Sequence, residues 1–376
     1  MKTPQRSLDA MLAPLRDPRI LLAASPDELT SIVSGLRRLR LLGRLAVAAE
    51  RSAVVDSLPR VVADQLRSAR VAAAARARAA LWELDRVAYA LRAQPGIPLV
   101  ALKGAGYLLT GLPGAVGRSF ADVDLLVPFD DLGTVESTLR RSGWVPAELT
   151  PYDERYYRRW THELPPLTHV ERALEVDVHH GILMPTARLK PSPALLFAAS
   201  RAVPGSRFRV LAPADRVLHA MAHLFYGSEM DGALRELLDI DDQLRHFAAD
   251  EAGFWDGFWP RATALGLGLP AYYGLRYSSR LLGTPVPPGV LEASRDAAPS
   301  APVARLMDGI VPRVLLPRPL DARNASDSLA RGAAFVRSHW VKMPPLLLAR
   351  HLSRKAWVRL ARDRGEPGSA FSRSGS

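Results

Sequence analysis

Cysteine is absent from the 376-residue sequence. Its absence excludes a disulfide framework, a thiolate metal site and a thiol nucleophile. The sequence also lacks any run near the ~18 uninterrupted apolar residues that a membrane-spanning helix needs. Charged residues and proline interrupt its first residues before an apolar segment forms. We therefore expect no transmembrane segment and no signal peptide, and we predict a soluble, cytoplasmic protein.

Lysine is scarce although the chain is basic. Lysine and arginine number 50 against 38 acidic residues, a net charge of +12, but only five of the basic residues are lysines. Such a charge attracts polyanions such as nucleotides, RNA or an anionic membrane surface, and it also fits a solvated basic surface. Because 48% of the residues are apolar, the chain can build a large core, which excludes wholesale disorder. The length predicts two or three domains.

Hydrophobic spacing divides the chain into regions. Apolar residues recur at helical spacing over about 26–92 and 192–282, whereas short apolar runs separated by turns fill 96–182. Proline and glycine thin the pattern over 283–319, and 322–364 is helical and basic. We predict an α/β (α+β) fold in which a small mixed sheet is flanked by helical regions. The expected boundaries are a helical N-terminal region 1–94, a core 95–185, a mostly helical region 186–364 and a disordered tail 365–376.

The core is expected to contain four or five strands and one or two helices. Each predicted strand is a short apolar run that ends at a turn or a proline. The predicted strands are 97–102, 122–127, 143–145, 164–170 and 174–181, and the predicted helices are 105–112 and 130–142.

Two aspartates open the second predicted strand. Asp122 and Asp124 are two residues apart, so their side chains project from one face of the strand. Two adjacent carboxylates repel each other, and burying them is costly unless a cation binds between them. Phosphoryl-transfer sites hold pairs of Mg²⁺ ions in this way. An Asp-x-Asp pair also occurs in many surface turns, but this pair begins an apolar strand, which favours a metal site.

A second polar row follows in the segment LEVDVHHGI. Glu175, Asp177 and His179 alternate with two valines, so they share one face of the last predicted strand. If the sheet brings Asp177 beside Asp122 and Asp124, three carboxylates would suffice for two metal ions. The alternative is an edge strand with a solvated polar face. The two strands together favour the metal site.

A strand–glycine–helix junction supplies candidate phosphate ligands. Lys103 and Gly104 follow the first predicted strand and begin a helix, where free backbone N–H groups favour a phosphate. Lys103 can add a point charge to a triphosphate, and Arg118, four residues before Asp122, is a second candidate. An ordinary tight turn between strand and helix is the alternative for Lys103–Gly104.

These segments in combination resemble an uncharacterised nucleotidyltransferase family of the polymerase-beta superfamily. The resemblance is carried by LVALKGAGYLL, by an arginine four residues before DVDLLV, by GW at 143–144 and by EVDVHH. The helical N-terminal part is similar too, as are HAMAHLFYG (219–227) and ELLDIDDQL (236–244). The similarity covers about residues 30–280.

The resemblance implies a nucleotidyltransferase core with a two-metal site. Asp122 and Asp124 would bind two Mg²⁺ ions, with Mn²⁺ as an alternative, and Asp177 would complete the site. An acceptor hydroxyl, on a small molecule, peptide or protein, would attack the α-phosphorus of a nucleoside triphosphate (NTP) and release pyrophosphate. Asp177 would help to deprotonate that hydroxyl. The residues expected near the triphosphate are Lys103, Gly104 and Arg118.

The acceptor side of the cleft is expected to involve three residues, His179, His223 and Asp239. Two features depart from the wider superfamily. Ala105 follows Gly104 where serine or glycine is usual, so a hydroxyl contact to phosphate is missing, and the spacing from Gly104 to the first aspartate is longer. These departures motivate an alternative, a catalytically silent nucleotide-binding or partner-binding scaffold with the same fold.

Two further alternatives remain at this stage. A glycosyltransferase that binds Mn²⁺ through Asp-x-Asp is disfavoured, because no long βαβ array precedes the motif. The basic segment over 340–364 mixes Leu, Trp and Arg at helical spacing, which fits a membrane surface or nucleic acid. We favour packing of its apolar stripe on the helical region, so nucleic acid is not a favoured partner.

Overall fold

The computed structural model describes residues 4–227, 230–317 and 325–342. The predicted disordered tail and most of the predicted basic C-terminal helix lie outside these residues. Among the described residues, no helix combines the length and the apolar character needed to cross a bilayer.

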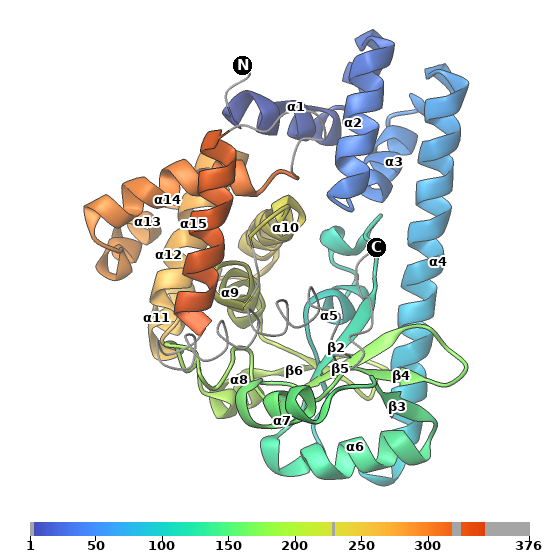
Figure 1. The fold of residues 1–376 in the computed structure, drawn as a ribbon, viewed down its shortest axis with the longest axis vertical. Helices are drawn as coiled ribbons and strands as arrows, with labels where there is room; N and C mark the ends of the chain where they lie inside the picture. The colour runs from blue at the N-terminus through green and yellow to red at the C-terminus, as the bar shows by residue number, and fades with distance from the viewer. Residues whose placement is uncertain (1–3, 228–229, 318–324, 343–376) are drawn as a thin grey trace, which may run out of the picture.

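The N-terminal part is helical, as its spacing predicts. Ser25 begins the second helix through a capping box: its hydroxyl accepts from the Glu28 N–H (3.4 Å), and the Glu28 carboxylate accepts from the Ser25 N–H (2.9 Å). The long helix α4 runs along one side of the molecule, from the other N-terminal helices to the sheet (Figure 1). The helices are α1 (Pro4–Arg16), α2 (Pro26–Arg38), α3 (Leu42–Arg51) and α4 (Arg60–Ala90).

The described strands form one mixed sheet. Its seven strands lie in the order β3-β4-β5-β2-β1-β7-β6. β2 is parallel to β5 and antiparallel to β1, and β1 is parallel to β7. The strands are β1 (Val100–Ala101), β2 (Asp122–Leu126), β3 (Trp144–Pro146), β4 (Leu167–His169), β5 (Glu175–His179), β6 (Arg201–Ala202) and β7 (Arg209–Val210). This arrangement confirms the predicted fold class.

Three helices accompany the first five strands, one more than predicted. α5 (Lys103–Leu109) follows β1, α6 (Leu132–Arg141) follows β2, and the unexpected α7 (Pro151–Trp160) lies between β3 and β4. The buried carboxylate of Glu83 in α4 ties α4 to the sheet, because it accepts from Trp144 Nε1 (2.7 Å) and from Arg172 Nε (2.6 Å).

The C-terminal part adds the remaining helices. Figure 1 shows α9 and α10 between the sheet and the outer helices α12, α14 and α15. Two helices, α13 and α14, occupy the stretch where proline and glycine thin the pattern, and α14 begins with proline in its first turn, which helices tolerate. The helices are α8 (Pro193–Ala199), α9 (Pro213–Ala222), α10 (Leu234–Asp250), α11 (Phe254–Ala264), α12 (Gly268–Tyr277), α13 (Pro288–Ala293), α14 (Ala301–Val314) and α15 (Ala325–Lys342).

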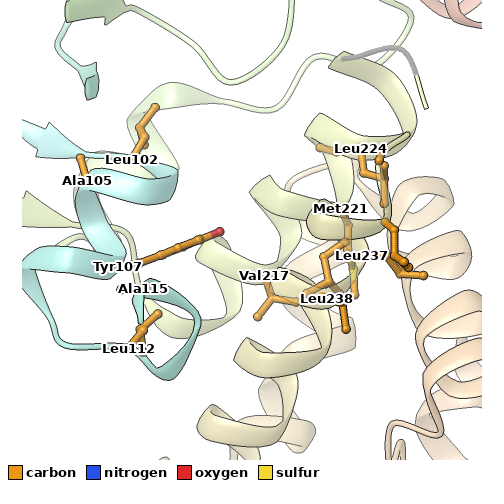
Figure 2. Packing of buried hydrophobic residues seen from close by; sticks show 14 of the residues in the cluster. Leu102, Ala105, Tyr107, Leu112, Ala115, Val217, Met221, Leu224, Leu237 and Leu238 are labelled. Carbon is orange, nitrogen blue, oxygen red and sulfur yellow. The ribbon is translucent and has the colours of Figure 1, made fainter. Parts of the chain in front are cut away.

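The core and the C-terminal helices share one hydrophobic interior. Figure 2 shows Tyr107 of α5 extending toward the C-terminal helices, on which Val217 and Met221 lie. The Tyr107 hydroxyl accepts from the side-chain amide of Gln243 in α10 (2.9 Å). The short strands β6 and β7 arise within a stretch whose spacing predicts helix, because strands of two residues carry no periodic signal.

Candidate functional site

Three carboxylates meet on two neighbouring strands. β2 carries Asp122 and Asp124, and β5 carries Asp177. In the parallel register Asp124 lies directly opposite Asp177, so the three side chains project from the same face of the sheet. The two polar rows therefore lie side by side, as the sequence predicts. Asp124 is buried, with 4% of its surface exposed.

Asp124 accepts hydrogen bonds from two sides. Its Oδ1 accepts from Lys103 Nζ (2.8 Å) and from His179 Nε2 (3.0 Å). Burial alone would raise the pKa of this carboxyl, but the Lys103 ammonium and the His179 bond hold that pKa well below its usual value. Conversely, burial opposes the charge of Lys103, while Asp124 raises the pKa of this ammonium. The pair is therefore ionised at neutral pH.

Asp177 and Asp122 are less well compensated. Burial, and then the charge of Asp124, raises the pKa of Asp177 to about 7. Asp122, at the start of β2, is more exposed, but partial burial of its carboxyl and then the charge of Asp124 raise its pKa too. Asp177 Oδ1 is buried and has no hydrogen-bond partner among the described residues. A bound divalent cation would remove both the repulsion and the missing partner, so the three carboxylates fit such an ion.

The junction between β1 and α5 places Lys103 at this site. Lys103 has a φ of +39°, in the left-handed region that side chains other than glycine rarely adopt. Gly104 follows it, and a Cβ there would lie 3.0 Å from the Phe120 ring and 3.5 Å from Arg118 Nε. A glycine at 104 is therefore what allows the loop carrying Arg118 to pack against α5.

Arg118 forms its contacts inside the protein. Its guanidinium forms an ion pair with Asp239 of α10, and both side chains are largely buried. Its charge also lies 5.4 Å from the centre of the Tyr107 ring. Burial raises the pKa of Asp239, although the Arg118 charge opposes this effect. Arg118 thus joins the loop before β2 to α10.

A cleft of about 110 Å³ brings most of the predicted residues together. Its lining includes the predicted residues Lys103, Gly104, Arg118, Asp122, Asp124, His223 and Asp239. Asp177 and His179 are not among its lining residues. A second cavity, of about 570 Å³, shares Arg40, His223, Arg235 and Glu236 with this cleft. Arg40, Arg235 and Glu236 were not predicted, because nothing in their local sequence distinguishes them from solvated helix-end residues.

His179, predicted on the acceptor side, is almost completely buried. Its Nε2 donates to Asp124, and its Nδ1 lies 3.3 Å from Glu163 Oε2. Sequence reasoning missed Glu163 and the adjacent His162. One feature of the sequence could have revealed them: a histidine and a glutamate, both common metal ligands, stand side by side directly before a predicted strand. Burial holds the pKa of His162 well below its ordinary value, so this imidazole is neutral at neutral pH.

The sheet, its parallel pair of acidic strands and the basic junction define a nucleotidyltransferase core. The chain belongs to a family described as uncharacterised nucleotidyltransferases, whose model matches residues 25–283. This membership confirms the resemblance and implies an NTP as substrate. Searches of the curated proteins and of the solved structures gave no match to this chain.

Proposed function

We propose that this protein transfers a nucleoside monophosphate from an NTP to a hydroxyl group of an acceptor and releases pyrophosphate. The observation that carries the proposal is the placement of Asp124 directly opposite Asp177 on parallel strands, with Lys103 bonded to Asp124. The acceptor is a small molecule, a peptide or a protein, bound on the side of the cleft where His223 lies.

The proposal includes a site for divalent metal ions. Asp122, Asp124 and Asp177 would hold Mg²⁺, or Mn²⁺ in its place, because carboxylate oxygens are the donors these ions prefer. Bound there, the ions would supply charge neutralisation for the triphosphate and for the attacking oxygen. The partnerless Asp177 Oδ1 and the raised pKa of Asp122 support this assignment.

Lys103 and Gly104 would bind the triphosphate. The Lys103 ammonium has three N–H donors and gives one of them to Asp124, so two remain for phosphate oxygens. Gly104 lines the same cleft at the start of α5, where backbone N–H groups favour a phosphate. This binding would place the α-phosphorus near the carboxylates, and most of the rate enhancement would come from positioning and charge.

The chemical step forms one phosphorus–oxygen bond and breaks another. The acceptor oxygen attacks the α-phosphorus as the bond to the bridging oxygen of pyrophosphate breaks, and pyrophosphate leaves with that electron pair. The hydroxyl proton passes to the carboxylate of Asp177. No redox partner is required.

One observation favours a second candidate, a nucleotide-binding scaffold without turnover. Arg118, a predicted triphosphate ligand, is paired with the buried Asp239. A triphosphate would have to compete with this ion pair for the guanidinium. Ala105 in place of the usual serine or glycine points in the same direction. Such a scaffold would bind an NTP and release no pyrophosphate.

The test compares unfolding temperatures with each of the four NTPs, with and without Mg²⁺. A ligand at 100 times its dissociation constant adds about 2.7 kcal/mol to the free energy of unfolding. We expect one NTP to raise the unfolding temperature of the wild type only with Mg²⁺. Asp122→Asn and Asp124→Asn should abolish this rise.

Asp130→Asn is the matched control, because Asp130 is an exposed aspartate that follows the same strand. It should keep the wild-type shift. Pyrophosphate release over a panel of hydroxyl acceptors then separates the two candidates. Binding without release supports the scaffold, whereas a shift that survives in Asp122→Asn and Asp124→Asn contradicts the carboxylate metal site and the proposed transferase.

A further inference from the structure

A second group of metal-ligating side chains lies next to Asp124. His162, Glu163 and His179 each offer one ligand atom, and these atoms lie within 4.8 Å of one another. We propose that they form a binding site for a transition-metal ion of the Zn²⁺ class, separate from the three carboxylates. The site would lie one hydrogen bond away from the nucleotidyl-transfer centre, through His179.

The backbone holds the three residues side by side. Residues 162–164 run antiparallel to the end of β5, where Glu163 forms a β-bridge with His179. The Leu164 N–H donates to the Val178 carbonyl (2.9 Å), and the His180 N–H donates to the His162 carbonyl (2.8 Å). The ligand group therefore sits on paired backbone and not on a free loop, which is the support that a defined metal geometry needs.

Two ring nitrogens in this group lack hydrogen-bond partners. His162 Nδ1 and His179 Nδ1 are buried, and neither has a partner among the described residues. His179 Nδ1 lies 3.3 Å from Glu163 Oε2, and this approach lacks hydrogen-bond geometry. Leaving a buried polar atom unpaired is costly, so each such atom requires an explanation. A metal ion would pair with both nitrogens at once.

The distances suit a small tetrahedral ion. Donor atoms about 2.0–2.1 Å from a tetrahedral Zn²⁺ lie about 3.4 Å from one another. The contact of His179 with Glu163 already has this length, and the other donor distances, which lie within 4.8 Å, would shorten by at most about 1.4 Å. Three protein ligands would leave one position for water or another ligand.

His179 would then act with both of its ring nitrogens. Nδ1 would ligate the metal while Nε2–H donates to Asp124, which is the carboxylate–histidine–metal arrangement that fixes a ligating imidazole. Two imidazoles and one carboxylate favour Zn²⁺ over Mg²⁺, whereas a set made of carboxylates alone favours Mg²⁺. The two neighbouring sites are thus expected to select different metals.

Co²⁺ is a suitable probe because four-coordinate Co²⁺ absorbs visible light far more strongly than six-coordinate Co²⁺ bound to oxygen. We expect the full-length protein to bind a single equivalent with strong absorption. In His162→Gln and in Glu163→Gln the affinity should fall at least about tenfold, since a three-ligand site loses one donor. Zn²⁺ should displace Co²⁺ and abolish the absorption.

Asp122→Asn is the control that separates this site from the carboxylates. It should keep the strong Co²⁺ absorption even though it is expected to lose the Mg²⁺-dependent NTP shift. Unfolding temperatures without metal show whether each variant folds. If His162→Gln does not fold, Glu163→Gln provides the test alone. The Glu163 side chain is 26% exposed, so this substitution disturbs the interior less. The proposal would be overturned if the folded His162→Gln and Glu163→Gln variants bound Co²⁺ as tightly as the wild type. It would also be overturned if only Asp122→Asn lost the absorption.

Discussion

At the scale of single residues, Asp124 connects both proposed sites. It accepts from Lys103 on one side and from His179 on the other, and it faces Asp177 across the strand pair. Removing one partner of a buried ion pair leaves the other charge uncompensated. Substitutions of Asp124 or Lys103 will therefore affect folding as well as ligand binding. The less buried Asp122 is a cleaner probe of metal and nucleotide binding.

The buried imidazole of His219 predicts how stability depends on pH. Burial, and then the charge of Lys103, lowers the pKa of His219 to about 3. The folded protein therefore keeps this ring neutral, whereas the unfolded chain binds a proton below about pH 6.5. The stability that comes from keeping His219 neutral is fully present well above pH 6.5. It falls as the pH drops, and the free energy of unfolding is lower by about 1.4 kcal/mol at pH 5.5.

Urea unfolding at pH 7.5 and 5.5 measures this contribution, with His219→Gln as the comparison. The difference in unfolding free energy between the two proteins should shrink at pH 5.5, because glutamine takes up no proton. Other groups, such as Asp177, also titrate in this range, but they are common to both proteins. An identical pH dependence of the two proteins would show that His219 is not held neutral.

At the scale of elements, a close backbone contact positions the loop that carries Arg118. Gly43 of α3 and Gly117 of this loop face each other. A Cβ on Gly43 would lie 2.5 Å from the Gly117 carbonyl oxygen, and one on Gly117 would lie 2.6 Å from the Gly43 carbonyl oxygen. Gly117 also has a φ of +72°. The contact leaves no room for a side chain, so only glycine at both positions allows α3 and the loop to approach this closely.

Gly43→Ala should therefore destabilise the protein by about 1–3 kcal/mol, because the added methyl group forces two backbone segments apart. The matched control is Gly133→Ala in α6, where a Cβ meets no atom within 4 Å. That change should be neutral or stabilise by about 0.4–1 kcal/mol. Chemical denaturation of both variants makes the comparison. Equal stability of the two would show that the α3–loop contact is not tight.

The elements with a long periodic signal were predictable from the sequence. The alternation that placed Asp122 and Asp124 on one face of their strand, and Asp177 in the polar row of the other strand, is present in β2 and β5, which are regular five-residue strands. The pairing of Arg118 with Asp239 was not predictable, since it joins residues far apart in the sequence. Nor was the approach of Glu163 to His179, which depends on an isolated bridge between the segment before β4 and the end of β5.

At the scale of the whole molecule, the strand order makes the core depend on the C-terminal region. β1 pairs with β2 on one side and with β7 on the other, and β7 follows residue 185. Arg216 of α9 donates to the Gly106 carbonyl of α5 (2.6 Å), and Gln243 of α10 donates to Tyr107. The sequence-based boundary at 185 therefore cuts through the sheet and through contacts that fix α5.

We accordingly expect a fragment of residues 95–185 not to fold on its own. It would lose two strands of the sheet and expose the edge of β1, and it would uncover the face of α5 that packs on α9 and is hydrogen-bonded to α10. Circular dichroism and denaturant titration of this fragment, compared with residues 1–342, make the measurement. We expect a cooperative transition only in the longer chain. A cooperative transition in the short fragment would show that the carboxylate site is an autonomous unit, to which the helices contribute only the acceptor side.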